Sequence, residues 1–135
     1  MLIDHGFDEW FGLPYSDDMG CVDQTWPNLP IAATCLKDGA PGVNRTSYEH
    51  WPLALYHSTA TNCSGQTTGS CNKDIIEQPA DLGTLAKRYA AFGEGVIAKA
   101  AASKGPFLLY VAFAHMHVPQ FCGPDHCGKT GNGAL

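Results

Sequence analysis

Two histidines near the end of the chain, His115 and His117, are spaced for joint chemistry. They follow an apolar run and come just before Val118 and Pro119. If extended backbone continues through them, both imidazole rings point to the same face. An imidazole near neutral pH can donate a proton, accept one or bind a metal ion. The pair is therefore a candidate site, and the structural alternative is two histidines that pack and hydrogen-bond at a strand end.

A zinc site is one extension of this pair. Cys122, His126 and Cys127 follow closely and have the ligand atoms that zinc prefers in proteins. The alternative is a small disulfide loop between Cys122 and Cys127, because Gly123 and Pro124 between them suit a turn.

A second group of polar side chains follows an aromatic run at the start of the chain. Pro14 favours a turn there, which would expose the hydroxyl of Ser16 and the carboxylates of Asp17 and Asp18. Adjacent carboxylates supply the hard oxygen ligands that calcium and magnesium bind. The spacing by itself favours the simpler interpretation, a solvated turn in which an aspartate caps its own backbone.

The chain divides into an aromatic, turn-rich start (1–20), a cysteine-bearing middle (21–80), a helix and strand (81–121) and a short end (122–135). The middle shows no clear period and is interrupted by proline and glycine. A stretch this long without periodicity is unusual inside a compact domain. We therefore predict a disulfide-held insertion there, not a core element.

The third block has the pattern of an αβ unit. Apolar residues recur at steps of three and four from residue 82, which predicts a helix with one buried face: Leu82, Leu85, Tyr89, Phe92, Val96, Ile97 and Ala100. Pro79 and Asp81 are its start signals. Residues 107–113 are apolar on both alternating faces, which predicts a strand covered by helices on both sides. His115 and His117 would then lie beyond its carboxyl end, where open α/β sheets bind ligands.

Composition places the chain in an oxidising compartment. Six cysteines and the glycosylation sequons at Asn44 and Asn62 favour the secretory pathway. Acidic residues outnumber basic ones, 13 to 8, and no block of like charge occurs, which argues against a nucleic-acid partner. No apolar run approaches the about 20 residues of a membrane span.

No signal peptide precedes the aromatic run, so we expect that the chain does not begin at the true start of its protein.

Two runs identify a family. Gly6 to Cys21 resembles the Gly-Phe-Asp…Gly-Ile-Pro-Tyr-Ser segment of arylsulfatases, and Pro106 to Pro119 resembles the Pro-Phe-(Leu/Phe)-Leu-Tyr…His-x-His-x-Pro strand of the same family. Residues 77–89 resemble the helix before that strand, and 22–74 match poorly. The resemblance implies a partial alkaline-phosphatase-like α/β sulfatase domain. It also implies hydrolysis of a sulfated small molecule or sugar in the lysosome or the extracellular space.

The resemblance assigns roles to three residues. His117 matches the histidine that contacts the sulfate and the leaving-group oxygen, a position suited to a general acid. Ser16 matches a serine that lines the same pocket through a hydrogen bond. His115 matches a position whose role we take to be orienting or packing beside His117. For the middle of the chain, we expect on this basis a nested pairing of Cys21 with Cys71 and of Cys35 with Cys63.

The departures from the family pattern define what the chain lacks. Arylsulfatases use a calcium-bound formylglycine made from the cysteine of a Cys-x-(Pro/Ala)-x-Arg signature, and no cysteine of this chain has that context. In the family, the carboxylates that bind the metal follow apolar strands, and no such sequence occurs here. Asp17 and Asp18 follow a turn, which argues against a metal at these residues. We therefore expect an internal fragment of a catalytic domain that is inactive alone, with nucleophile and calcium elsewhere. The alternatives are a secreted disulfide-rich binding module and a small zinc-binding protein.

Overall fold

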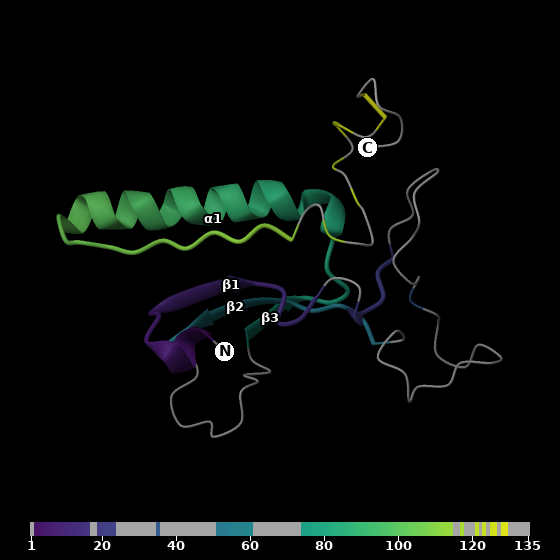
Figure 1. Cartoon of the computed structure of the whole chain (residues 1–135), viewed down its shortest axis with the longest axis horizontal. Coiled ribbons are helices and arrows are strands. Elements are labelled where there is room, and N and C mark those ends of the chain that lie inside the picture. The colour runs from purple at the N-terminus through teal and green to yellow at the C-terminus, as the bar shows by residue number, and fades with distance from the viewer. Residues whose placement is uncertain are drawn as a thin grey trace.

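A small antiparallel sheet with one long helix above it forms the ordered part of the molecule (Figure 1). The computed structural model describes residues 2–16, 19–23, 35, 51–60, 74–114, 117, 121, 123, 125–126 and 128–129. Its elements are the short 3₁₀ helix η1 (Leu2–His5), β1 (Glu9–Gly12), β2 (Leu55–Thr59), β3 (Ile75–Glu77) and α1 (Leu82–Ser103). The strand order is β1-β2-β3, so β2 is central.

The sheet joins strands that are far apart in the sequence. Glu9 lies opposite Thr59 and Gly12 opposite Tyr56, whereas β2 pairs with β3 across an irregularity at Leu55 and Tyr56. The prediction that 21–80 holds no core element is therefore wrong at β2 and β3. Strands of three to five residues are too short for a period of two to stand out, and their partners lie tens of residues away.

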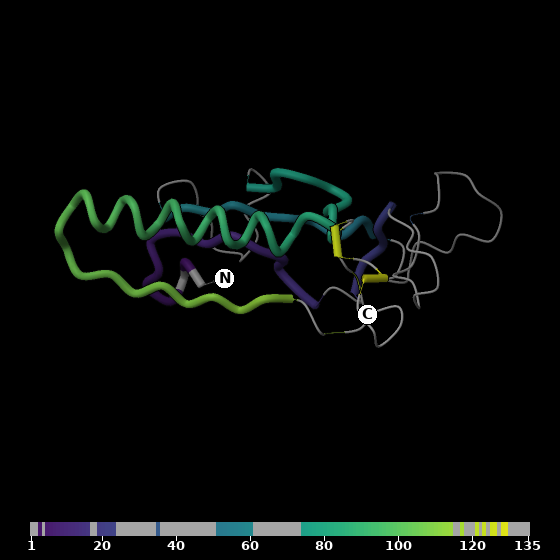
Figure 2. Tube along the Cα trace, turned by 90° about the horizontal axis from the view of Figure 1, so that it is seen from above, coloured from purple at the N-terminus to yellow at the C-terminus, as the bar shows by residue number. Residues whose placement is uncertain are grey.

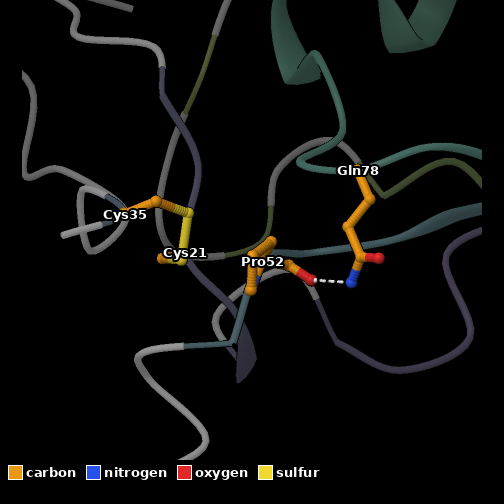
Figure 3. Close-up of a disulfide and its surroundings, with 4 residues drawn as sticks. All are labelled: Cys21, Cys35, Pro52 and Gln78. Atoms are coloured by element: carbon orange, nitrogen blue, oxygen red, sulfur yellow. Dashed lines mark hydrogen bonds between the residues drawn. A yellow bond between two sulfur atoms is a disulfide. The ribbon is translucent and has the colours of Figure 1, made fainter. Parts of the chain in front are cut away.

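The chain that leaves β1 returns to the sheet beside residues 51–53. The backbone N–H of Cys21 donates to the carbonyl of Trp51 at 2.9 Å, and the N–H of Leu53 donates to the carbonyl of Cys21 at 2.9 Å. Figure 3 shows this junction, where the side-chain amide of Gln78 also donates to the carbonyl of Pro52 at 2.7 Å. These contacts fix the segment that follows β1 against the segment that leads into β2.

A disulfide joins Cys21 to Cys35 at the same junction, with the two Cα atoms 4.8 Å apart (Figure 3). The nested pairing of Cys21 with Cys71 and Cys35 with Cys63 is therefore wrong. The backbone N–H of Cys35 donates to the carbonyl of Val22 at 3.0 Å, which brings Cys35 back beside Cys21. Cys63, Cys71, Cys122 and Cys127 lie outside the described residues, as do the sequons at Asn44 and Asn62.

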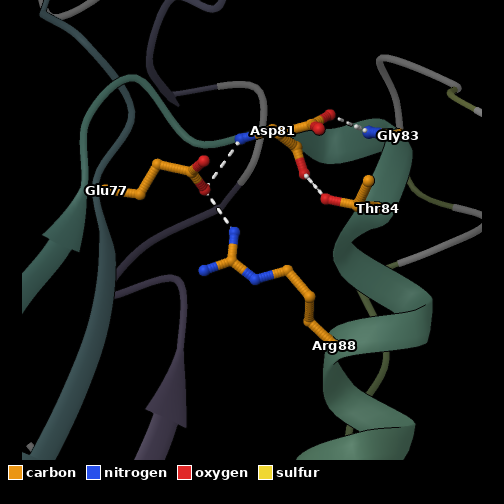
Figure 4. Close-up of polar contacts among 5 residues, drawn as sticks. All are labelled: Glu77, Asp81, Gly83, Thr84 and Arg88. Atoms are coloured by element: carbon orange, nitrogen blue, oxygen red, sulfur yellow. Dashed lines mark hydrogen bonds and ion pairs between the residues drawn. The ribbon is translucent and has the colours of Figure 1, made fainter.

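Helix α1 begins where the sequence predicts. Asp81 is its N-cap, and a carboxylate oxygen of Asp81 accepts a hydrogen bond from the N–H of Gly83 at 2.9 Å (Figure 4). Such a bond satisfies one of the donors that a helix leaves open in its first turn. Glu77 reinforces the start, because its carboxylate accepts from the N–H of Asp81 and pairs with Arg88.

The core lies between the first half of α1 and the sheet. Its buried side chains are Val22, Leu53, Leu55, Ala80, Leu82, Leu85, Tyr89 and Phe121, with Phe11, Leu13 and Ala114 packed against them. The predicted helix face is confirmed for Leu82, Leu85 and Tyr89, but Ile97 is 50% exposed. The second half of α1 thus extends beyond this core. Within the described part of the chain, no helix is long and apolar enough to cross a membrane.

Residues 107–113, hereafter the extended segment, run back along α1 (Figure 2). They are extended but belong to no strand, so the predicted buried strand is absent here. Phe107, Leu108, Tyr110, Val111 and Phe113 are between 45% and 77% exposed. A strand exists only where a neighbour accepts and donates its backbone hydrogen bonds, and no described residue pairs with this segment as a strand. Its apolar pattern correctly predicts extended backbone, but it does not predict the exposure of the side chains or the lack of a paired strand among the described residues.

Candidate functional site

Ser16 lies four residues beyond the end of β1, directly after Pro14 and Tyr15. The residue is half-buried, and its backbone carbonyl accepts a hydrogen bond from the N–H of Met19 at 3.0 Å. The chain bends at Pro14 and Tyr15, where the sequence predicts a turn. Asp17 and Asp18 are outside the described residues, and the predicted role of the Ser16 hydroxyl stays a prediction.

His117 follows the extended segment, and its side chain is exposed. His115 lies outside the described residues. Side-chain contacts show that β1 and the extended segment both run opposite to α1. Glu9 contacts Lys99 and Phe11 stacks on Phe92, whereas Leu109 lies beside Gly93 and Phe113 contacts Tyr89. β1 and the extended segment therefore both lie along α1 and run in the same direction as each other (Figure 1).

A cavity among the described residues lies elsewhere. It has a volume of about 530 Å³ and runs along β1, between residues 5–11, the face of α1 that carries Tyr89, Phe92 and Val96, and residues 106–112. Neither Ser16 nor His117 lines it. This cavity, hereafter the groove, is mostly apolar, with His5, Asp8 and Glu9 toward one end. A groove beside two acidic residues is a poor receptor for a sulfate anion.

A charged cluster that sequence reasoning missed joins three elements next to the groove. The Glu9 carboxylate of β1 lies 2.8 Å from Nε2 of His57 on β2 and 3.3 Å from Nζ of Lys99 on α1. Burial alone raises the pKa of Glu9, but the hydrogen bonds and positive charges of His57 and Lys99 outweigh it, so the pKa lies below the ordinary 4.5. The His57 ring also packs edge-on against Phe11 and Phe92.

A buried carboxyl was also missed. Asp74, directly before β3, is 2% exposed, and Tyr56 on β2 is 7% exposed. Burial raises the pKa of the Tyr56 hydroxyl, and the neighbouring Tyr15 and Asp74 add to this effect. No sequence signal marks these residues, because Asp74 lies in the poorly matched stretch and comes near Tyr56 through the pairing of β2 with β3.

Metal ligands do not gather in the described part of the chain, where no three His, Cys, Asp or Glu residues lie close enough to hold an ion. His126 is exposed, whereas Cys122 and Cys127 fall outside the described residues. The zinc hypothesis thus gains no support from residues that the structure describes.

Comparison with known proteins decides the family. The chain is 42% identical over 116 residues to human arylsulfatase G, which is 84% of this chain and 19% of that protein. It is 42% identical over 123 residues to mouse arylsulfatase G, which is 88% of this chain and 20% of that protein. Bovine arylsulfatase A is 31% identical over 129 residues, 96% of this chain and 21% of its own length.

The chain belongs to the sulfatases. The resemblance seen in its two terminal runs thus extends through most of the sequence. No family model matches the chain. It spans about a fifth of the length of the curated relatives it matches. The likeness therefore concerns one segment of a sulfatase.

Proposed function

We propose that this sulfatase segment supplies one wall of a sulfate-ester pocket, with Ser16 and His117 as its substrate-contacting residues. The observation that carries the proposal is the 42% identity over 116 residues to an arylsulfatase. The fold supports it, because Ser16 follows β1, His117 follows the extended segment, and these two segments run in the same direction along α1.

The chemistry of these residues suits ester hydrolysis. A protonated imidazole at His117 would donate its proton to the alcohol oxygen as the S–O bond breaks, so that a neutral alcohol leaves. The hydroxyl of Ser16 would donate a hydrogen bond to a sulfate oxygen and orient the ester. His115 would pack beside His117 and orient its ring. The substrate is a sulfated small molecule or sugar, in the secretory pathway, the lysosome or the extracellular space.

Sulfatases of this kind use calcium and a formylglycine, and neither the cysteine contexts of the sequence nor the described residues fit these groups. No cysteine stands in a Cys-x-(Pro/Ala)-x-Arg context, and the described residues offer no cluster of metal ligands. No step is therefore assigned to the chain beyond substrate contact and proton donation. We propose that the 135-residue chain alone does not turn over aryl sulfates.

Hydrolysis of a chromogenic aryl sulfate tests both statements. The purified chain with calcium should show no turnover above the buffer rate. In a sulfatase that contains this segment, His117→Ala should lower kcat by about 10²-fold or more, because a positioned general acid contributes 10²- to 10⁴-fold. His126→Ala, at an exposed histidine outside the proposed pocket, is the matched control. An unchanged kcat in the His117 variant would contradict the general-acid role.

A further inference from the structure

Tyr89 of α1 contacts both of the segments that lead to the proposed pocket residues. Its ring packs edge-on against Phe11 of β1, with the ring centroids 5.7 Å apart, and edge-on against Phe113 of the extended segment, with the centroids 5.9 Å apart. The residue is only 9% exposed. One buried ring on the helix therefore touches both segments, and both contacts are formed within the described part of the chain.

The two contacts lie at matching distances along the chain from the pocket residues. Gly12, the last residue of β1, comes four residues before Ser16, and a Cβ atom added at Gly12 would lie 3.6 Å from the Tyr89 hydroxyl oxygen. Phe113 comes four residues before His117. Four residues of extended chain span at most about 14 Å. Ser16 and His117 are thus each tied by a short stretch of backbone to a residue beside Tyr89.

Ring pairs of this kind hold their members more strictly than aliphatic contacts do. The edge of one aromatic ring is attracted to the face of another, which favours a defined angle and centroid separation. The ring planes of Tyr89 and Phe11 meet at 89°, and those of Tyr89 and Phe113 meet at 65°. Loss of the Tyr89 ring would therefore let β1 and the extended segment shift relative to each other.

We infer that Tyr89 is a positioning residue for the sulfate-ester pocket, where it fixes the distance between Ser16 and His117. The inference rests on the proposed function, in which Ser16 orients the ester and His117 donates a proton to the leaving alcohol. Both residues have to meet one substrate, so a shift of one relative to the other takes the imidazole away from the alcohol oxygen. A displacement of about 1 Å can cost about 10²-fold in rate when reacting groups have to be aligned.

Kinetics of a sulfatase that contains this segment test the inference, with kcat expressed per folded enzyme. Tyr89→Leu keeps an apolar side chain in the core but removes the ring, so it should lower kcat by about 10-fold while KM changes little. Tyr89→Phe keeps the ring and should keep most of the wild-type kcat. Leu55→Ala is the matched control, because Leu55 is fully buried in the same core but lies on β2, which carries neither pocket residue. The inference is overturned if Tyr89→Leu keeps the wild-type kcat, or if Tyr89→Phe or Leu55→Ala loses as much as Tyr89→Leu.

The leaving group of the substrate separates positioning from general damage. A positioned acid matters more when the departing alcohol is weakly acidic, because such an alcohol leaves poorly as an anion. The loss in Tyr89→Leu should thus be larger with phenyl sulfate than with para-nitrophenyl sulfate, whereas a merely loosened core would slow both equally. Phe113 is 53% exposed, so Phe113→Leu removes the other ring of the contact with little risk to folding and should show the same difference. Equal losses with both substrates would overturn the inference.

A double variant separates the inference from the proposed function. Because Tyr89 acts through the position of His117, Tyr89→Leu should add little further loss in an enzyme that already carries His117→Ala. Fully additive losses, or a loss in His117→Ala without one in Tyr89→Leu, would overturn the positioning role alone. An unchanged kcat in His117→Ala would overturn the proposed function, and the inference with it.

Discussion

Glu9 shows how a single carboxylate couples three elements of this fold. Its lowered pKa means that the folded state favours the ionised form. The resulting stabilisation is present above the ordinary value of 4.5 and is lost as the pH falls through the lowered pKa. We therefore expect Glu9→Gln to lower the free energy of unfolding at neutral pH by about 0.5–1 kcal/mol, because its two partners are partly exposed. Urea unfolding at a series of pH values measures this.

A variant of the neighbouring residue Asp8 is the control for the urea unfolding series. Asp8 is an exposed carboxylate one residue away, and Asp8→Asn should leave the acid-side loss of stability unchanged. In Glu9→Gln that loss should become shallower, and adding salt should weaken the wild-type effect because the Lys99 charge is screened. If Glu9→Gln kept the full acid-side loss, the contacts to His57 and Lys99 would contribute nothing to folding.

At the scale of elements, the start of α1 depends on Asp81. Replacing Asp81 by alanine removes the acceptor for the N–H of Gly83 and should cost about 1 kcal/mol of the free energy of unfolding. Asp81→Asn keeps a side-chain oxygen and should cost only a few tenths of that amount. Chemical denaturation followed by circular dichroism compares the two variants. Equal losses in both would mean that the Asp81 charge matters and the capping oxygen does not.

The elements also show what the sequence could predict and why. Helix α1 was predictable because its cap and its apolar period lie within the same 20 or so residues. The strands β2 and β3 were not, since their pairing is set by contacts with distant residues. The contact between Glu9 and His57 was missed for the same reason, as they are separated by 48 residues. The extended segment was predicted as backbone, but its burial depends on neighbours that local pattern does not specify. The roles of Ser16 and His117 come from family resemblance and stay predictions.

For the whole molecule, the junction at Cys21 is the point where the middle of the chain is tied to the sheet. Cys21 and Val22 are fully buried beside Leu53, and the disulfide to Cys35 closes a loop with a sequence separation of 14. A loop of this length restricts the unfolded chain by about 3 kcal/mol in the loop-entropy description. The disulfide between Cys21 and Cys35 should therefore be detectable as a covalent link between two peptides and as a contribution to the free energy of unfolding.

Peptide mapping under non-reducing conditions tests for the covalent link. A proteolytic digest should contain a Cys21 peptide linked to a Cys35 peptide, and a Cys21 peptide linked to Cys71 would contradict the structure. The variant Cys35→Ser lacks the disulfide, so it should have a free energy of unfolding about 3 kcal/mol lower than the wild type in guanidinium titrations. The double variant with Cys21→Ser as well should lose little more, because the first change already removes the crosslink. A much larger second loss would show that the buried Cys21 side chain stabilises the core mainly by packing against Leu53.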